Sequence, residues 1–228
     1  MVHHPAMTRR DTLVLVLIAG SLWGLSEVAL NAGLRFLIPD LRATGLVASG
    51  MFLMGMLLGT GRSPVVVPAA ALIAVACRQL VVPILQTSPL CKANACIAVT
   101  LQAASVAGAA AVLGRRIHHR PAMQAVVAGA GALVAAVSFH TVGLHVAPCA
   151  YLQSFGQPGG LVVFLGREGI AWATAAALAM PVGYSWGHRL AHPLTRVRAI
   201  SAPLYYASSL ALVAGCWIAC GLMTAAGH

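Results

Sequence analysis

Long apolar stretches separated by short polar segments run along the whole 228-residue sequence. They lie at about 12–34, 44–60, 65–86, 95–114, 122–147, 161–185 and 203–225. These lengths are what a helix needs to cross roughly 30 Å of hydrocarbon. We therefore predict an all-α fold, a polytopic transmembrane helix bundle of about seven spans, with residues 1–228 forming a single integral membrane domain. Six spans are the alternative, because Pro68 and Pro83 interrupt the third stretch, and a re-entrant segment there would reverse the sidedness of everything after it.

The composition excludes an ordinary soluble domain. Hydrophobic residues make up 60% of the chain and charged residues only 8%, whereas soluble domains carry about 25% charged residues. The sequence contains no His-Glu-x-x-His or Walker A motif. We predict that the protein is not an enzyme and holds no cofactor, and that active transport would need a partner ATPase or an ion gradient.

The formal net charge of +10 is unevenly distributed along the chain. Nine of the fourteen Lys and Arg residues precede the first span or lie between spans two and three, four and five, or six and seven, which share one side of a seven-span bundle. They are Arg9, Arg10, Arg62, Arg115, Arg116, Arg120, Arg189, Arg196 and Arg198. This positive-inside bias predicts a cytoplasmic amino terminus and an inner (plasma) membrane location. We expect these segments to contact anionic membrane lipid, and we predict no nucleic-acid partner.

The first span carries a carboxylate and an amide within an otherwise apolar helix. Gly20, Gly24, Glu27 and Asn31 are spaced 4, 3 and 4 residues apart, which places them on a single stripe of that helix. An ionisable group in lipid costs roughly 2.5–3.5 kcal/mol on insertion scales, so such groups usually face the interior of a bundle and find partners there. We therefore expect Glu27 and Asn31 to face other spans.

Other polar side chains also fall in the predicted extracytoplasmic halves of their spans. They are Arg78 and Gln79 in the third, Gln102 in the fourth, His140 in the fifth, and Arg167 and Glu168 in the sixth. Together with Glu27 and Asn31 they predict a cup that is open to the outside and binds a solute. One alternative is that Glu27 pairs with Arg78, and Arg167 with another acid, only because buried charges need partners. Catalysis or cofactor binding at the cup is a further alternative.

Cysteine and histidine residues raise the question of redox or metal chemistry. The predicted outer surface holds three cysteines, any two of which an oxidising exterior permits to form a disulfide: Cys91, Cys96 and Cys149. The other three are expected to be small buried hydrophobic residues: Cys77, Cys216 and Cys220. His140 and His145 lie about 140° apart around a helix and are poorly placed to share a metal ion, so we predict no metal site. The remaining candidate haem ligands are expected in loops: His118, His119, His188 and His192.

Small residues recur at four-residue spacing in several spans, as in Gly20 and Gly24 and in Gly55 and Gly59. Longer ladders run through Ala103, Ala107 and Ala111 and through Ala171, Ala175 and Ala179. Such ladders allow helices to approach closely in lipid. We expect them to pack within this chain, and the alternative is that one of them docks another membrane subunit.

The chain resembles the membrane-embedded substrate-binding subunits (S components) of energy-coupling-factor vitamin transporters. The resemblance is in a small Ala- and Gly-rich bundle with an outward polar cup and no motor domain, and in the opening "LWGLSE" of the first span. Gly20, Gly24 and the segment 29–33 resemble the small-residue motif with which those subunits contact their transmembrane partner. That family usually has six spans, one fewer than predicted here. The resemblance implies a second membrane subunit and an ATPase as partners.

These observations favour a membrane substrate-binding or transport subunit that takes a small polar or amphipathic solute from the extracytoplasmic side. The first alternative is a membrane redox or metal-handling protein that uses Cys91, Cys96, Cys149 and His145. The second is a structural or assembly subunit of a membrane complex, with no ligand of its own.

Overall fold

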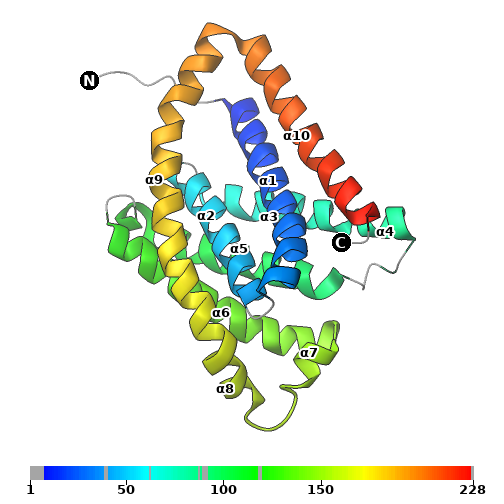
Figure 1. Cartoon of the computed structure of the whole chain (residues 1–228). Coiled ribbons are helices and arrows are strands. Elements are labelled where there is room, and N and C mark those ends of the chain that lie inside the picture. Colours follow the sequence, from blue (N-terminus) through cyan, green and yellow to red (C-terminus); the bar gives the residue numbers. More distant parts are fainter. Residues whose placement is uncertain are drawn as a thin grey trace.

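The computed structural model describes residues 8–38, 41–61, 63–86, 88, 92–117 and 120–226, and these form helices joined by turns (Figure 1). The α-helices are α1 (Arg9–Leu37), α2 (Arg42–Gly59), α3 (Val66–Gln79), α4 (Val81–Leu85), α5 (Ala93–Leu113), α6 (Pro121–Val146), α7 (Ala150–Gln153), α8 (Gly160–Phe164), α9 (Ile170–Ile200) and α10 (Ala202–Ala225). A 3₁₀ turn, η3 (Gly114–Ile117), follows α5, and a π-helical turn, η4 (Leu165–Gly169), joins α8 to α9.

Seven helical segments of the described chain are long and apolar enough to cross a membrane. They are Arg9–Leu34, Arg42–Gly59, Val66–Leu85, Ala93–Leu113, Pro121–Val146, Gly160–Ile200 and Ala202–Ala225. The predicted all-α class and the predicted number of spans are thereby confirmed. The third segment is continuous across α3 and α4 as far as Leu85. These are the helices that a multi-pass membrane protein requires.

The sixth segment is longer than the sequence pattern predicts. We expected a span that ends near residue 185 with His188 and His192 in a loop, and this is wrong, because α9 continues to Ile200. A proline inside a helix normally breaks it, yet Pro181 and Pro193 both lie within α9. Neighbouring helices hold the extension in place: α2 packs along α9 as far as His188, and Arg198 near its end pairs with a carboxylate of α1.

Close contact between α2 and α9 depends on glycines of both helices. A Cβ atom at Gly55 would clash with the carbonyl oxygen of Met180, and one at Gly183 would clash with that of Phe52. Gly59 and Gly187 repeat this arrangement one turn further along. The absence of side chains therefore lets the two backbones touch.

The contact between α1 and α3 is built in the same way. A Cβ atom at Gly20 would meet Ile73, and one at Gly24 would meet the side chain of Cys77. The prediction that small-residue ladders pack within the chain is thus confirmed for Gly20 and Gly24, as it is for Gly55 and Gly59. Gly33, by contrast, faces open space.

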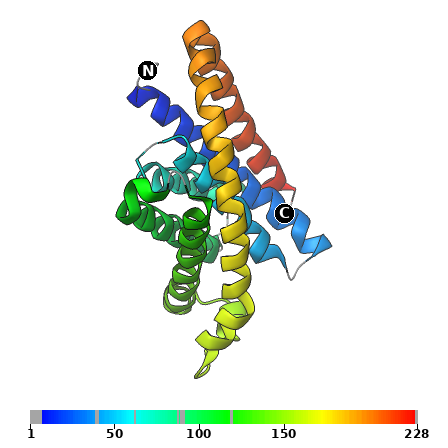
Figure 2. The same cartoon turned by 90° about the vertical axis from the view of Figure 1, so that its left-hand side faces the viewer.

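The helix axes fall into two groups that differ in orientation. In Figure 1, α3, α5 and α6 cross the direction of α1, α9 and α10, and Figure 2 shows α5 and α6 closer to end on. The two groups meet where α1 packs on α3 and where α6 packs on α9. One hydrophobic core joins them, and its largest fully buried side chains include Trp23, Met51 and Phe164. The helices therefore form a crossed packing instead of a set of parallel rods.

Candidate functional site

A buried ion pair joins α1 to α3. The guanidinium of Arg78 donates to a carboxylate oxygen of Glu27, and the two residues are only 8% and 4% exposed. Trp23, one turn before Glu27, directs its indole N–H toward the other carboxylate oxygen at 3.4 Å. The close α1–α3 contact at Gly24 brings these two side chains within reach of each other. The alternative prediction that Glu27 pairs with Arg78 is confirmed.

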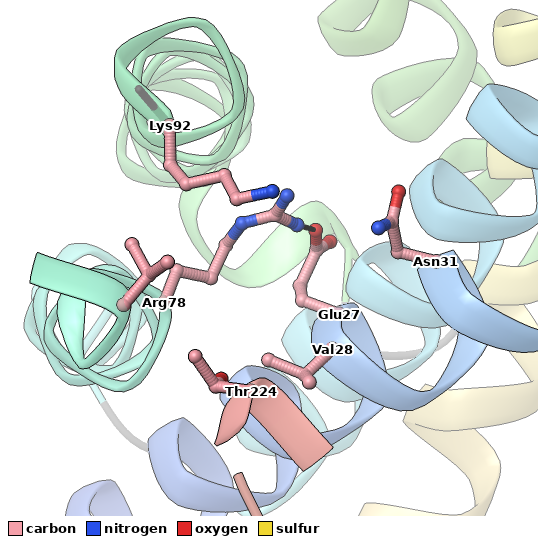
Figure 3. A pocket seen from close by; sticks show the side chains of 7 residues that line it. Glu27, Val28, Asn31, Arg78, Lys92 and Thr224 are labelled. Atoms are coloured by element: carbon pink, nitrogen blue, oxygen red, sulfur yellow. Dashed lines mark hydrogen bonds and ion pairs between the residues drawn. The ribbon is translucent and has the colours of Figure 1, made fainter. Parts of the chain in front are cut away.

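The ion pair lies on the wall of an open pocket of about 330 Å³, a volume that includes space open to the surroundings. The lining residues come from α1, α3, α4, α10 and the start of α5: Glu27, Val28, Asn31, Arg78, Val81, Lys92 and Thr224. Figure 3 shows the side chain of Lys92 extending toward the guanidinium of Arg78, and the amide of Asn31 beside Glu27. The pocket therefore combines two cations, one acid, an amide and a hydroxyl with two valines.

Three of the eight predicted site residues, Glu27, Asn31 and Arg78, line this pocket. Gln79 is next to Arg78 in sequence, and its amide donates to the sulfur of Cys96 at 3.2 Å. Gln102 is buried and donates to the backbone carbonyl of Val47 at 3.1 Å. These two amides connect helices, and neither is among the residues that line the pocket.

The other three predicted residues form a separate group around the short helices α7 and α8. His140 lies 3.3 Å from the carbonyl oxygen of Phe155 and packs against the ring of Phe164. Glu168 lies 3.9 Å from its sequence neighbour Arg167, whose side chain is 65% exposed. The structure thus divides the predicted cup into two groups of residues.

Glu168 also contacts a tyrosine that the sequence analysis did not single out. Tyr151 belongs to α7, between two spans. Burial raises the pKa of Tyr151 above its ordinary value, and the hydrogen bond to the carboxylate of Glu168 raises it further. The phenol therefore stays protonated and acts as the donor of this hydrogen bond. The π-helical turn η4 presents Glu168 at this position.

The pocket contains a basic residue that the sequence analysis did not single out. Lys92 is the only lysine of the sequence and occupies the amino-terminal cap of α5. Its rarity in a chain with so few charged residues was a usable signal. Thr224, near the end of α10, gave none, because threonine is common in membrane helices.

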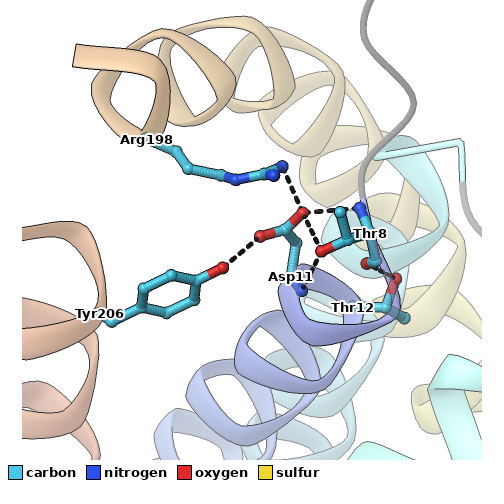
Figure 4. Close-up of polar contacts among 5 residues, drawn as sticks. All are labelled: Thr8, Asp11, Thr12, Arg198 and Tyr206. Carbon is cyan, nitrogen blue, oxygen red and sulfur yellow. Dashed lines mark hydrogen bonds and ion pairs between the residues drawn. The ribbon is translucent and has the colours of Figure 1, made fainter. Parts of the chain in front are cut away.

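A second buried carboxylate, which the sequence analysis also missed, lies at the start of α1. Asp11 is fully buried and accepts hydrogen bonds from the backbone N–H and the hydroxyl of Thr8, at 2.7 and 2.8 Å. It also accepts from the hydroxyl of Tyr206 at 3.0 Å and from the guanidinium of Arg198 (Figure 4). Thr8-x-x-Asp11 has the spacing of a helix capping box, which was the signal available in the sequence. We call these four residues the Asp11 cluster; it ties α1 to α9 and α10.

The cysteines are thiols throughout the described chain. Of the predicted disulfide candidates, Cys96 and Cys149 are free, and Cys91 lies outside the described residues. The predicted burial of the other three, Cys77, Cys216 and Cys220, is confirmed. Cys77 on α3 and Cys220 on α10 are hydrogen-bonded to each other.

Among the residues that the structure describes, no group of three or more His, Cys, Asp or Glu side chains is placed to hold a metal ion. The imidazole of His145, which the redox or metal-handling alternative uses, is exposed and contacts the backbone carbonyl of Thr141 at 2.7 Å. The described geometry thus adds no observation in favour of that alternative.

Comparison with known proteins adds no family to this geometry. No family model, no curated protein and no solved structure matches the chain. The resemblance to the substrate-binding subunits of energy-coupling-factor transporters therefore stays an expectation, and the pocket is the feature that points to a function.

Proposed function

We propose that the protein is an integral membrane substrate-binding or transport subunit that takes up a small polar or amphipathic solute at the Glu27–Arg78 pocket. The observation that carries the proposal is the composition of this pocket, in which a buried ion pair and a further cation face open space. Ionisable groups at membrane depth are costly, and where they line a cavity they usually belong to a solute or ion pathway. The pocket brings a few converging polar groups together with apolar side chains, a combination that is typical of small-molecule sites.

The position of each group along its span supports access from the extracytoplasmic side. Glu27 and Arg78 lie in the second halves of the first and third spans, Lys92 directly precedes the fourth, and Thr224 ends the seventh. In a chain whose spans alternate in direction, these positions share one side of the membrane. The segments rich in arginine occupy the other side, which the positive-inside rule makes cytoplasmic. We therefore propose an inner-membrane protein with its amino terminus in the cytoplasm.

The same alternation applies to the Asp11 cluster. Asp11 begins the first span, Arg198 ends the sixth, and Tyr206 begins the seventh. These three positions share the side opposite to the pocket. Contacts between these three span ends are expected if seven spans alternate in direction across the membrane. They therefore support the sidedness proposed above.

The proposed partners follow from the need for an energy source, which the pocket alone does not provide. The sequence carries no nucleotide-binding motif, so energy for uptake against a gradient comes from an ion gradient or from a further membrane subunit with an ATPase. Large apolar side chains exposed on α10, such as Leu210, Ile218 and Leu222, are suited to contact with lipid.

A thermal-unfolding screen tests this function. The purified full chain is heated in detergent with a panel of vitamins, nucleobases and amino acids, and the double variant Glu27→Gln/Arg78→Gln serves as the control. A ligand present at 100 times its Kd stabilises a protein by about 2.7 kcal/mol, so a true solute raises the Tm of the wild type and leaves that of the double variant unchanged.

The opposite result identifies a different role. If no solute changes the Tm, and the double variant differs from the wild type in stability alone, the ion pair only holds the helices together. The protein is then a structural or assembly subunit.

A further inference from the structure

We infer that the solute of the Glu27–Arg78 pocket carries a single negative charge, a carboxylate that binds between Lys92 and Arg78. This inference rests on the function proposed above and names the chemical class of the solute. It starts from the charges of the lining residues, which are two cations and one acid.

The acid is already occupied. Glu27 accepts the guanidinium of Arg78 and lies 3.4 Å from the indole nitrogen of Trp23, and it is 4% exposed. This pair is electrically neutral. The ammonium of Lys92 is therefore the excess charge of the pocket, and it faces the guanidinium of Arg78 (Figure 3).

Lys92 has no partner within the described ranges of the chain: it takes part in neither an ion pair nor a side-chain hydrogen bond there. A second cation beside a buried arginine is unfavourable, because like charges repel and little water screens them. An anion that bridges the ammonium and the free edge of the guanidinium removes this repulsion. Charge-assisted hydrogen bonds from lysine and arginine to a carboxylate are among the strongest that proteins make.

The net charge and the remaining lining residues indicate which class of anion fits. One net positive charge matches a monoanion, whereas a phosphate dianion would leave an excess negative charge in the pocket. Asn31 makes no side-chain hydrogen bond to any described residue, and its amide can both donate and accept. Thr224 adds a hydroxyl, and Val28 and Val81 add a short apolar wall. A small monocarboxylate with a polar substituent and a short apolar part satisfies all of these groups.

The test uses carboxylates and their own amides as matched probes. The Kd values of acetate and acetamide, benzoate and benzamide, and nicotinate and nicotinamide are measured by calorimetry on the full chain in detergent at pH 7. We expect at least one acid to bind and its amide to bind about 10- to 100-fold more weakly, which is the range for a lost charge-assisted hydrogen bond. Lys92→Gln should weaken the binding of the acid by a similar factor and leave the Kd of the amide unchanged.

Two further variants separate the role of Lys92 from changes in overall charge. Lys92→Arg keeps the cation and should retain binding of the acid. Arg120→Gln removes one positive charge at an exposed residue outside the pocket and should leave all Kd values unchanged.

The outcomes distinguish this inference from the function on which it rests. If a neutral or cationic solute of the wider panel binds in the pocket and no acid does, or if an amide binds as tightly as its acid, the inference is overturned and the proposed function stands. If no solute of any charge binds, both fail.

Discussion

Two buried carboxylates on one helix, Asp11 and Glu27, have very different surroundings. They are 16 residues apart on α1, which corresponds to roughly 24 Å along the helix. Asp11 accepts four hydrogen bonds, from both groups of Thr8, from Tyr206 and from Arg198, and is fully enclosed. Glu27 has one strong partner, Arg78, and a long contact to Trp23, and it borders an open pocket.

This difference teaches how to separate a structural ion pair from a binding site. At Asp11 the acid accepts four hydrogen bonds, which is about as many as a carboxylate can accept. At Glu27 the partner, Arg78, also lines the open pocket, and Lys92 supplies a charge that no described side chain balances. Burial of an acid is common to both sites, so burial alone does not mark a function. The excess cation beside a pocket is the feature on which we base the proposed binding site.

Arg78→Ala is expected to have the largest effect on stability. It leaves the carboxylate of Glu27 buried without its partner, and breaking a buried pair in this way typically costs about 3–5 kcal/mol of unfolding free energy. Unfolding in detergent with a denaturant measures the change. Adding Glu27→Gln to an Arg78→Gln variant should restore much of the stability, because no buried charge then remains, but not the binding of a solute. A loss below about 1 kcal/mol for Arg78→Ala would indicate that the pair is solvated.

Asp11→Asn should have a smaller effect, a loss of about 1–3 kcal/mol. The amide oxygen can still accept from Thr8, the amide NH2 can donate to the hydroxyl oxygen of Tyr206, and Arg198, which is partly exposed, can turn toward water. The same denaturant series measures this loss, with Arg120→Gln as a control for net charge. Because Asp11 lies at the opposite end of α1, solute binding should not change, and a lost binding signal in a folded variant would break the comparison.

Tyr206→Phe is expected to have the smallest effect of the three. It removes a single neutral donor at 3.0 Å from Asp11, and such a bond contributes roughly 0.5–1.5 kcal/mol. Three donors remain on the carboxylate, so α1 stays attached to α9 through Arg198. Hydrogen exchange of the first turn of α10 should report the change more sensitively than global unfolding. A loss as large as that of Asp11→Asn would mean that Tyr206, and not Arg198, holds the cluster together.

Much of the fold could be predicted because hydrophobic length is a direct signal. Segments that cross hydrocarbon must be long and apolar, and the seven found in the sequence correspond to seven helices. The end of α9 could not be found this way, since Arg189 and Arg198 make its last turns look like a cytoplasmic loop. The crossing of α3, α5 and α6 with α1 and α9 depends on close contacts between helices, and the sequence pattern does not contain it.

The site could be predicted only in part, because helix rotation is invisible in one sequence. The pairing of Glu27 with Arg78 was one of the alternatives predicted, since a buried acid needs a base. His140 and Glu168 were assigned to the same cup because they share a predicted depth, but they face α7 and α8. Lys92 was missed because a residue at a span boundary reads as a loop residue until the neighbouring helices are placed.

The most direct test of the difference between the two carboxylate sites is a side-by-side measurement of solute affinity in Asp11→Asn and Lys92→Gln. The tightest carboxylate probe is titrated into both variants and into the wild type under one condition. We predict a Kd within about twofold of wild type for Asp11→Asn, as expected of sites far apart, and a Kd raised about 10- to 100-fold for Lys92→Gln. Equal weakening in both variants, or an unchanged Kd in Lys92→Gln, would contradict the assignment of binding to the pocket and of anchoring to the Asp11 cluster.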